Sequence, residues 1–208
     1  MAVDPAGLLA LQVAPFALSA SITPGPNNLL VMASASRFGL RPTLPHMLGI
    51  LAGFPAMLVA VGLGIAPAFE RMPQLHLALQ IAGILYLVYL AWRIGLAAGP
   101  AEARGSGRPL SFVQAALFQW INPKAWAMAL GSLATYTSVG GELLGEVTSI
   151  AGVFALAAAP SIACWALLGD RIRRLLQTPA TRRLFNWAMA LLILASLLPA
   201  FRSILAAF

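Results

Sequence analysis

The sequence predicts an all-α integral membrane protein with six transmembrane helices, arranged as two inverted three-helix repeats. Three observations carry this prediction: few charged residues, six long apolar stretches, and arginines that gather at alternate helix ends. Of the 208 residues, 60% are hydrophobic and 9% are charged, and the mean hydropathy is +0.86. A soluble domain is usually about one quarter charged, so this chain lacks the polar surface of a water-soluble protein.

The six apolar stretches lie near residues 7–34, 45–67, 74–95, 111–137, 146–168 and 185–206. Each is long enough for a helix of about 20 residues, which crosses about 30 Å of hydrocarbon. The strands of a membrane barrel need only about 10 residues, so these lengths disfavour a barrel. The first stretch does not resemble a signal peptide, because its start carries Asp4 and no Lys or Arg.

The arginines predict the orientation of the helices. Short loops rich in Lys and Arg stay in the cytoplasm. Ten of the twelve arginines fall at alternate helix ends, so both termini are expected outside the cytoplasm; the ten are Arg37, Arg41, Arg93, Arg104, Arg108, Arg171, Arg173, Arg174, Arg182 and Arg183. The other ends hold Arg71 and Arg202 with Asp4, Glu70, Glu142 and Glu146. This topology and anionic lipid account for the net charge of +7 without an acidic partner.

Several function classes are disfavoured by the residues themselves. No basic patch interleaved with aromatic residues is present, so nucleic-acid binding is not expected. The sequence contains no HExxH, Walker loop, GxGxxG or GxSxG motif. Cys164 is the single cysteine, and it cannot form a thiolate metal cage alone. We therefore expect no enzyme, no catalytic residue, no cofactor and no metal site.

The first apolar stretch is interrupted at residues 22–30, which read ITPGPNNLL. Proline removes a backbone donor and clashes with the preceding turn, and the residue before it is pushed out of the helical region. Pro24 and Pro26 flank Gly25, which permits dihedral angles that other residues resist. Thr23-Pro24 has the pattern of a helix start, with a capping residue followed by proline. The helix is therefore expected to restart inside the membrane.

A second interruption occurs at the corresponding position in the other half of the chain. The fourth stretch reads LFQWINPKAWAMALG, and Asn122-Pro123 is a strong helix-start pattern. Prolines also occur within the second and fifth stretches, at Pro55 and Pro160. The chain is thus predicted to be one transporter domain over residues 1–208, with repeats at 1–96 and 111–208 and a cytoplasmic linker at 97–110. Three spans per half make the repeats inverted, and paired broken helices indicate a transport site near the midplane.

The restarted helices predict an anion-accepting cavity. Helix N-termini carry free N–H groups and a positive dipole end, and irregular backbone at this depth is tolerated only inside protein or beside a cavity. Lys124 is the only lysine and the only charge well inside a span, so it suits a substrate carboxylate. The alternative is that Lys124 extends to the cytoplasmic interface. The candidate substrate-binding and transport residues are Thr23, Pro24, Gly25, Pro26, Asn27, Asn28, Asn122, Pro123 and Lys124.

Gly49 and Gly53 form a small-x-x-x-small pair in the second stretch. Small residues at this spacing let two membrane helices approach closely. We interpret the pair as a helix-packing contact rather than as part of the transport path.

Three motifs together resemble the lysine exporter and homoserine/threonine resistance family (LysE/RhtB). They are TPGPNNLLVMASASRFG followed by LGILAG, then AGILYLVYLAW, and finally NPKAW, in the family's order and spacing. The resemblance implies a six-helix exporter of amino acids or related metabolites in a bacterial inner membrane, driven by a proton or ion gradient. It places the family's transport motifs on Pro24, Gly25, Pro26 and Asn27 and on Asn122, Pro123 and Lys124.

The leading hypothesis is a secondary-active exporter of a small zwitterion, whose carboxylate meets the half-helix N-termini and Lys124. Rocking of the two three-helix halves would alternate access. A passive channel or pore for small solutes, and a transporter of a non-amino-acid metabolite, remain the alternatives. The expected partners are the substrate, membrane lipid and a coupling proton or ion, and a homodimer is one option for the oligomeric state.

Overall fold

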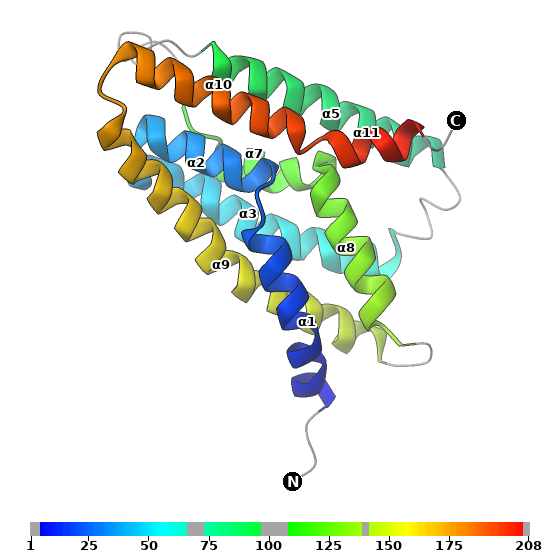
Figure 1. Ribbon diagram of the computed structural model, residues 1–208. Helices are drawn as coiled ribbons and strands as arrows, with labels where there is room; N and C mark the ends of the chain where they lie inside the picture. The colour runs from blue at the N-terminus through cyan, green and yellow to red at the C-terminus, as the bar shows by residue number, and fades with distance from the viewer. Residues whose placement is uncertain (1–4, 66–72, 97–107, 139–141, 206–208) are drawn as a thin grey trace.

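The computed structural model describes residues 5–65, 73–96, 108–138 and 142–205, and within these ranges the regular structure is helical (Figure 1). The first half of the chain contains α1 (Pro5–Ile22), α2 (Pro26–Phe38), α3 (Leu40–Ala60), the π-helical segment η1 (Val61–Ile65) and α5 (Pro73–Gly95). The second half contains α7 (Phe112–Phe118), the 3₁₀ segment η2 (Gln119–Ile121), α8 (Pro123–Tyr136), α9 (Leu143–Leu175), α10 (Pro179–Ala195) and α11 (Leu198–Leu205). Most of the predicted linker, residues 97–107, lies outside the described residues, as do Asp4, Glu70, Arg71 and Arg104.

The all-α membrane class is confirmed for the described ranges, whereas the number of spans is only partly reproduced. Four helices are long and apolar enough to cross a bilayer: Leu40–Gly64, Leu77–Gly95, Leu143–Leu175 and Pro179–Arg202. The pair Ala6–Ile22 and Pro26–Phe38, bent by 49°, makes a fifth span if it is counted as one. The remaining predicted span, 111–137, consists of α7, η2 and α8, which are each shorter than a bilayer requires. Six spans in two inverted repeats therefore stay a prediction.

The outer surface of the helices is apolar, as expected for contact with lipid. Leu11, Leu156 and Leu184 are 71%, 78% and 74% exposed. Soluble monomers rarely expose contiguous apolar patches of more than a few hundred Å². A surface with many leucines this exposed is suited to hydrocarbon rather than to water.

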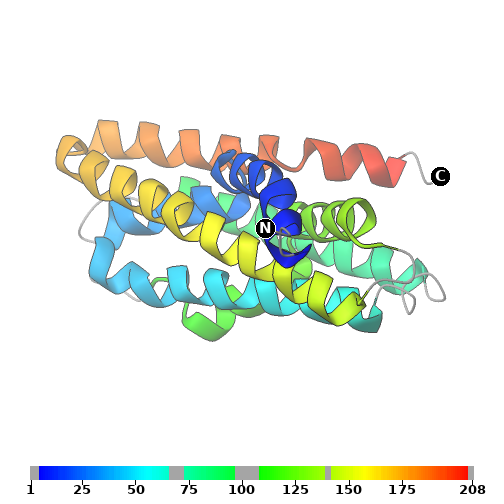
Figure 2. The same cartoon turned by 90° about the horizontal axis from the view of Figure 1, so that it is seen from below.

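Each half of the chain has the same order: a broken helix followed by two long helices. The broken pair α1 and α2 packs along α9 of the second half, and the broken segment that begins with α7 packs on α3 of the first half. The third helices, α5 and α10, pack against each other (Figures 1 and 2). The halves are therefore interleaved in this conformation, and rocking of two separate three-helix halves stays a prediction.

Gly49 and Gly53 face α7 at very short range. A Cβ at Gly49 would lie 2.3 Å from the Phe112 carbonyl oxygen, and one at Gly53 would lie 2.5 Å from the Cα of Ala116. Neither backbone atom can move aside without shifting a helix, so glycine at both positions sets the approach of α3 to α7.

The buried core continues through both halves. One cluster joins α1, α3, α8 and α9, and within it Phe54 and Phe154 stack edge to face with ring centroids 5.3 Å apart. A second cluster joins α2, α5 and α10 around Leu29, Leu87 and Ile193. These two clusters flank the helix breaks and hold them in place.

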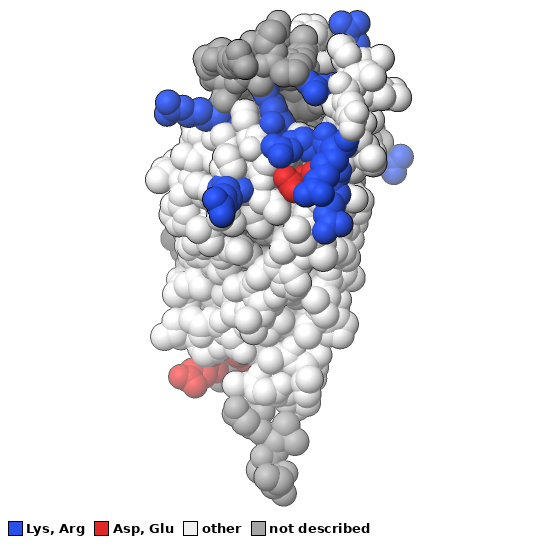
Figure 3. Space-filling model, turned by 90° about the vertical axis from the view of Figure 1, so that its left-hand side faces the viewer, with Lys and Arg blue, Asp and Glu red and all other residues white. Residues whose placement is uncertain are grey.

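Charge is segregated along the length of the molecule. On the face shown in Figure 3, Lys and Arg side chains gather toward one end, and acidic side chains lie near the other end and among the basic ones. The ends of α2, α5 and α9 and the start of α10 supply these arginines. Which end faces the cytoplasm stays a prediction.

Candidate functional site

The first helix break lies between α1 and α2. Gly25 is the N-cap of α2 with an extended backbone (φ −169°, ψ 177°), and Pro26 follows as its first residue. The first hydrogen bond of α2 runs from the Leu29 N–H to the Gly25 carbonyl at 3.0 Å. The N–H groups of Asn27 and Asn28 precede that bond, so they have no carbonyl partner within the helix.

The helix start predicted at Thr23-Pro24 is wrong by two residues. The Thr23 hydroxyl donates back to the Ser19 carbonyl of α1 instead of capping a new helix. Threonine side chains readily bond the carbonyl four residues earlier, and this bond closes the last turn of α1. The restart therefore falls at Gly25-Pro26.

The second break precedes α8 and matches the predicted helix start. Asn122 has an extended conformation, and its side-chain Oδ1 accepts a hydrogen bond from the Lys124 N–H at 3.1 Å. Pro123 occupies the first helical position, and the first intrahelical bond joins the Trp126 N–H to the Asn122 carbonyl at 3.2 Å. Asparagine and proline thus act here as the capping residue and the first residue of the helix.

Carbonyl groups at the end of α1 are satisfied by side chains of α9. The Ser161 hydroxyl donates to the Ser21 carbonyl at 2.7 Å, and the Trp165 indole N–H donates to the Ile22 carbonyl at 3.1 Å. A broken helix exposes carbonyls that hydrocarbon cannot solvate. Hydrogen bonds from α9 lower the energetic cost of this break within a membrane. Both donors come from the helix that also packs along α1 and α2.

Lys124 reaches across to the first break. Its Nζ donates to the Thr23 carbonyl at 2.8 Å, and the Asn28 amide donates to the same carbonyl at 3.1 Å. The lysine stem crosses directly over Gly25, where a Cβ would lie 2.6 Å from Lys124 Cδ and 3.0 Å from its Nζ. The Lys124 ammonium group is therefore held at the N-terminus of α2, and its depth in the membrane stays a prediction.

An amide pair forms a second link between the two breaks. Asn27 Nδ2 donates to Gln119 Oε1 at 2.9 Å, and Gln119 Nε2 donates to Asn27 Oδ1 at 3.2 Å. Gln119 also donates to the Ala115 carbonyl at 2.9 Å and is fully buried. Gln119 is not among the site residues predicted from the sequence, although a glutamine inside the apolar run that leads to Asn122 is a usable signal.

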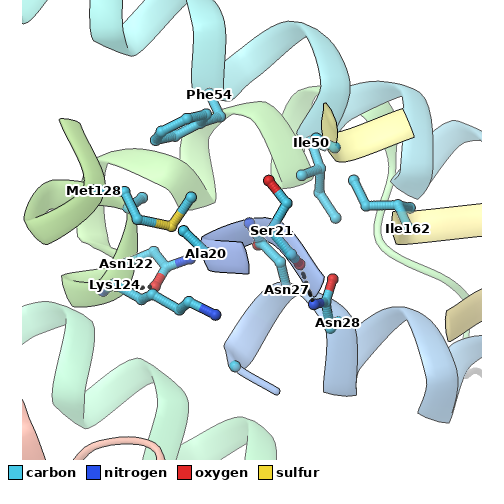
Figure 4. Close-up of a pocket in the computed structure, with 13 residues that line it drawn as sticks. Ala20, Ser21, Asn27, Asn28, Ile50, Phe54, Asn122, Lys124, Met128 and Ile162 are labelled. Carbon is cyan, nitrogen blue, oxygen red and sulfur yellow. Dashed lines mark hydrogen bonds between the residues drawn. The ribbon is translucent and has the colours of Figure 1, made fainter. Parts of the chain in front are cut away.

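These groups surround a narrow pocket, with Lys124 and Asn122 contributed by α8 and Ser21, Asn27 and Asn28 by the first break (Figure 4). The apolar part of its wall comes from four large side chains: Ile50, Phe54, Met128 and Ile162. The volume of this cavity is about 50 Å³, which is room for about four water molecules.

The predicted site residues divide into two groups. Gly25, Asn27, Asn28, Asn122 and Lys124 line the pocket, and Thr23 supplies the carbonyl that holds the lysine. The prolines shape the chain instead and do not line the pocket; they are Pro24, Pro26 and Pro123. No Asp or Glu lines it either, and the described ranges contain no cluster of His, Cys, Asp and Glu suited to a metal ion.

The arrangement is suited to binding a small zwitterion. An ammonium group, two asparagine amides and the N-terminus of α2 converge where a carboxylate would sit. The Thr23 carbonyl accepts from Lys124 and Asn28, so it could accept from a substrate ammonium group once Lys124 moves away.

Comparisons with known proteins agree with the motifs. Residues 18–197 match the family model described as LysE type translocator. The chain is 31% identical to proteins named cysteine/O-acetylserine efflux protein, over 181 residues in Escherichia coli O139:H28 (strain E24377A / ETEC) and over 180 in Escherichia coli (strain K12) and Shigella flexneri. Each match covers 86% of this chain and 90% of the relative. No solved structure matches the chain at comparable significance.

Proposed function

Because this chain belongs to the LysE type translocator family, and is therefore a transporter rather than an enzyme, we propose that it exports a small neutral amino acid or a closely related zwitterion. Relatives named as cysteine/O-acetylserine efflux proteins support a substrate of this size and charge. The proposed location is a bacterial inner membrane, with several spans and both termini outside the cytoplasm. The arginines at one end support this orientation.

The position of Lys124 is the observation that carries the proposal. Its Nζ lies at the restarted end of α2 and is held by the neutral Thr23 carbonyl, with no carboxylate in the pocket wall. A charge placed inside an apolar span is costly and is kept where a function requires it. A substrate carboxylate would exchange this neutral partner for an ionic one, with Asn27, Asn28 and Asn122 adding directional hydrogen bonds.

The pocket wall supports a neutral rather than a basic substrate. Ile50, Phe54, Met128 and Ile162 offer apolar surface to a side chain. A lysine or arginine substrate would need a carboxylate for its side-chain charge, and the described wall supplies none. An uncharged side chain such as that of cysteine or O-acetylserine meets no such penalty.

Export would proceed by exchange of partners at the two breaks. Substrate binding draws Lys124 away from Thr23, which removes one of the links between α8 and the first break. The Asn27–Gln119 pair is a second side-chain link between the two breaks, and its opening would extend the pocket. We propose that the proton gradient drives the cycle, with the ammonium group of Lys124 or of the substrate carrying the proton.

Transport into inside-out membrane vesicles tests this proposal. Vesicles that contain the protein should accumulate O-acetylserine or cysteine, and should take up lysine more slowly. Collapse of the proton gradient should stop the accumulation, whereas a passive channel would only equilibrate the solute. Lys124→Gln keeps a donor but removes the charge, and we expect it to slow accumulation strongly.

Arg171→Gln serves as the control for loss of a positive charge, because Arg171 is exposed on α9 and does not line the pocket. It should accumulate both solutes as the wild type does. Wild-type accumulation by correctly inserted Lys124→Gln protein would refute the role given to the lysine.

A further inference from the structure

The pocket at the helix breaks is small for the solutes that its polar groups suit. Its volume of about 50 Å³ is room for about four water molecules, whereas ligand sites typically measure about 300–1,000 Å³. An amino acid with even a short side chain has more heavy atoms than four waters, so part of the wall must move aside when it binds. Which part moves decides how long a side chain the pocket accepts.

Three of the four large side chains in the described wall are fixed by the core. Phe54, Ile50 and Ile162 are all buried. The Phe54 ring packs edge to face against Phe154, with ring centroids 5.3 Å apart. The two isoleucines belong to one buried cluster, and branching at Cβ restricts their rotamers. Because protein cores are close-packed, moving any of the three would open a void.

Met128 is the adjustable part of the wall. It comes from α8 and is only partly buried, at the edge of the cluster that contains Phe54. Methionine is unbranched, has three rotatable bonds and adapts its shape to irregular spaces. The Met128 side chain can therefore fill the pocket beside a short solute and turn aside for a longer one.

Met128 lies one helical turn after Lys124. Residues four apart share a helix face and are separated by about 6 Å along the axis. Both side chains enter the pocket from α8, and Ala125 lines it between them (Figure 4). A zwitterion whose carboxylate meets Lys124, and whose ammonium group takes the Thr23 carbonyl, has only the apolar wall left for its side chain. Met128 lies one turn along that wall.

We propose that Met128 is a specificity-determining residue of the transport site, which limits the length of the side chain that the pocket accepts. This rests on the proposed function, since it takes the exported solute to be a zwitterion whose carboxylate meets Lys124. It narrows the substrate class to amino acids with a short, uncharged side chain. A longer member of that class, such as O-acetylserine, enters by turning Met128 aside.

Amino acids that grow by one methylene at a time test the proposal. The series is 2-aminobutyrate, norvaline and norleucine, and its first member has the shape of cysteine with a methyl in place of the thiol. We would measure kcat/KM for accumulation in inside-out vesicles by the wild type, Met128→Ala and Met128→Phe. Leu130→Ala is the matched control, because Leu130 lies on α8, is exposed and does not line the pocket.

The measured quantity is the ratio of kcat/KM for norleucine to kcat/KM for 2-aminobutyrate. Met128→Ala should raise this ratio about tenfold or more, because one methylene in an apolar pocket is worth a factor of that size. Met128→Phe puts a larger and stiffer side chain in the same place and should lower the ratio about tenfold. Leu130→Ala should not change it. The amount of folded protein cancels in a ratio, so a destabilised variant is still informative.

Unchanged ratios in both Met128 variants, with O-acetylserine still accumulated, would overturn the role of Met128 and leave the proposed function standing. An equal rise in Leu130→Ala would also overturn it, since the effect would then come from a loosened helix. Shifted ratios in vesicles whose wild type accumulates neither cysteine nor O-acetylserine would support the role of Met128 and refute those substrates. If no version accumulates any of these zwitterions, the proposed function is wrong and the role of Met128 falls with it.

Discussion

Gly25→Ala isolates the contact between the lysine and the first helix break. The backbone of Gly25 is extended (φ −169°, ψ 177°), a conformation that alanine adopts without strain. The added methyl would lie 2.6 Å from Lys124 Cδ and 3.0 Å from Nζ, whereas ordinary contact begins at 3.4 Å. The flexible lysine must therefore leave its place over α2, while the fold loses nothing else.

The displaced lysine would no longer meet the substrate carboxylate at the start of α2, and the size of the effect follows from that lost charged hydrogen bond. A hydrogen bond from a charged donor contributes about 1.5–3 kcal/mol, and each 1.4 kcal/mol is a factor of ten. We expect kcat/KM for O-acetylserine transport in proteoliposomes to fall by about 10- to 150-fold. The free energy of unfolding should fall by no more than about 1.5–3 kcal/mol, the contribution of the lost Lys124–Thr23 hydrogen bond, because the flexible side chain absorbs the clash itself.

A double-mutant cycle with Lys124→Ala makes the test specific. When the lysine stem is absent, the methyl of Gly25→Ala has nothing to displace, so the double variant should transport no worse than Lys124→Ala alone. Gly152→Ala is the control, since a Cβ there meets nothing within 4 Å. Losses that multiply in the double variant, or wild-type transport by Gly25→Ala, would refute the reasoning.

Three further predictions concern the contacts that hold the breaks. Asn27→Ala and Gln119→Ala should each lower the free energy of unfolding, and a thermal-unfolding cycle should show a coupling of about 1–2 kcal/mol from their two hydrogen bonds; additive losses would contradict a direct pair. Gly83→Ala should destabilise by about 3 kcal/mol or more, because its Cβ would lie 1.8 Å from the Ile121 carbonyl oxygen, while Gly131→Ala, with open space around it, should not destabilise. Ser161→Ala should cost only about 0.6 kcal/mol, since the Ser21 carbonyl keeps its bond from Asn28 at 2.7 Å; a loss several times larger in thermal unfolding would show that Asn28 does not compensate.

The local course of the chain at the breaks was accessible from the sequence. Proline and asparagine act on the dihedral angles and donors of their immediate neighbours, so Asn122-Pro123 identified the start of α8 correctly. The start of α2 lies two residues after the predicted position, because Thr23 bonds the carbonyl of Ser19 behind it rather than a donor ahead. A threonine can cap a following helix or bond the carbonyl four residues before it, and Thr23 does the second.

The contacts that make the site were decided by tertiary structure. Lys124 and Thr23 are 101 residues apart, Asn27 and Gln119 are 92 apart, and Trp165 is 143 residues from Ile22. No local sequence pattern predicts these pairings, since they depend on how α9 packs along α1 and α2 and on how α8 faces those two helices.

The sequence by itself determined that this is a membrane protein of the LysE type with two interrupted helices and a lone lysine beside one of them. Composition and proline chemistry act locally, so their effects on the chain can be predicted from individual residues. Only the tertiary structure decided that Lys124 lies on the opposite break, that Gln119 joins Asn27, and that His46 is buried with no hydrogen-bond partner among the described residues. Those outcomes follow from interleaved helix packing, in which the second half supplies the groups that satisfy the broken backbone of the first.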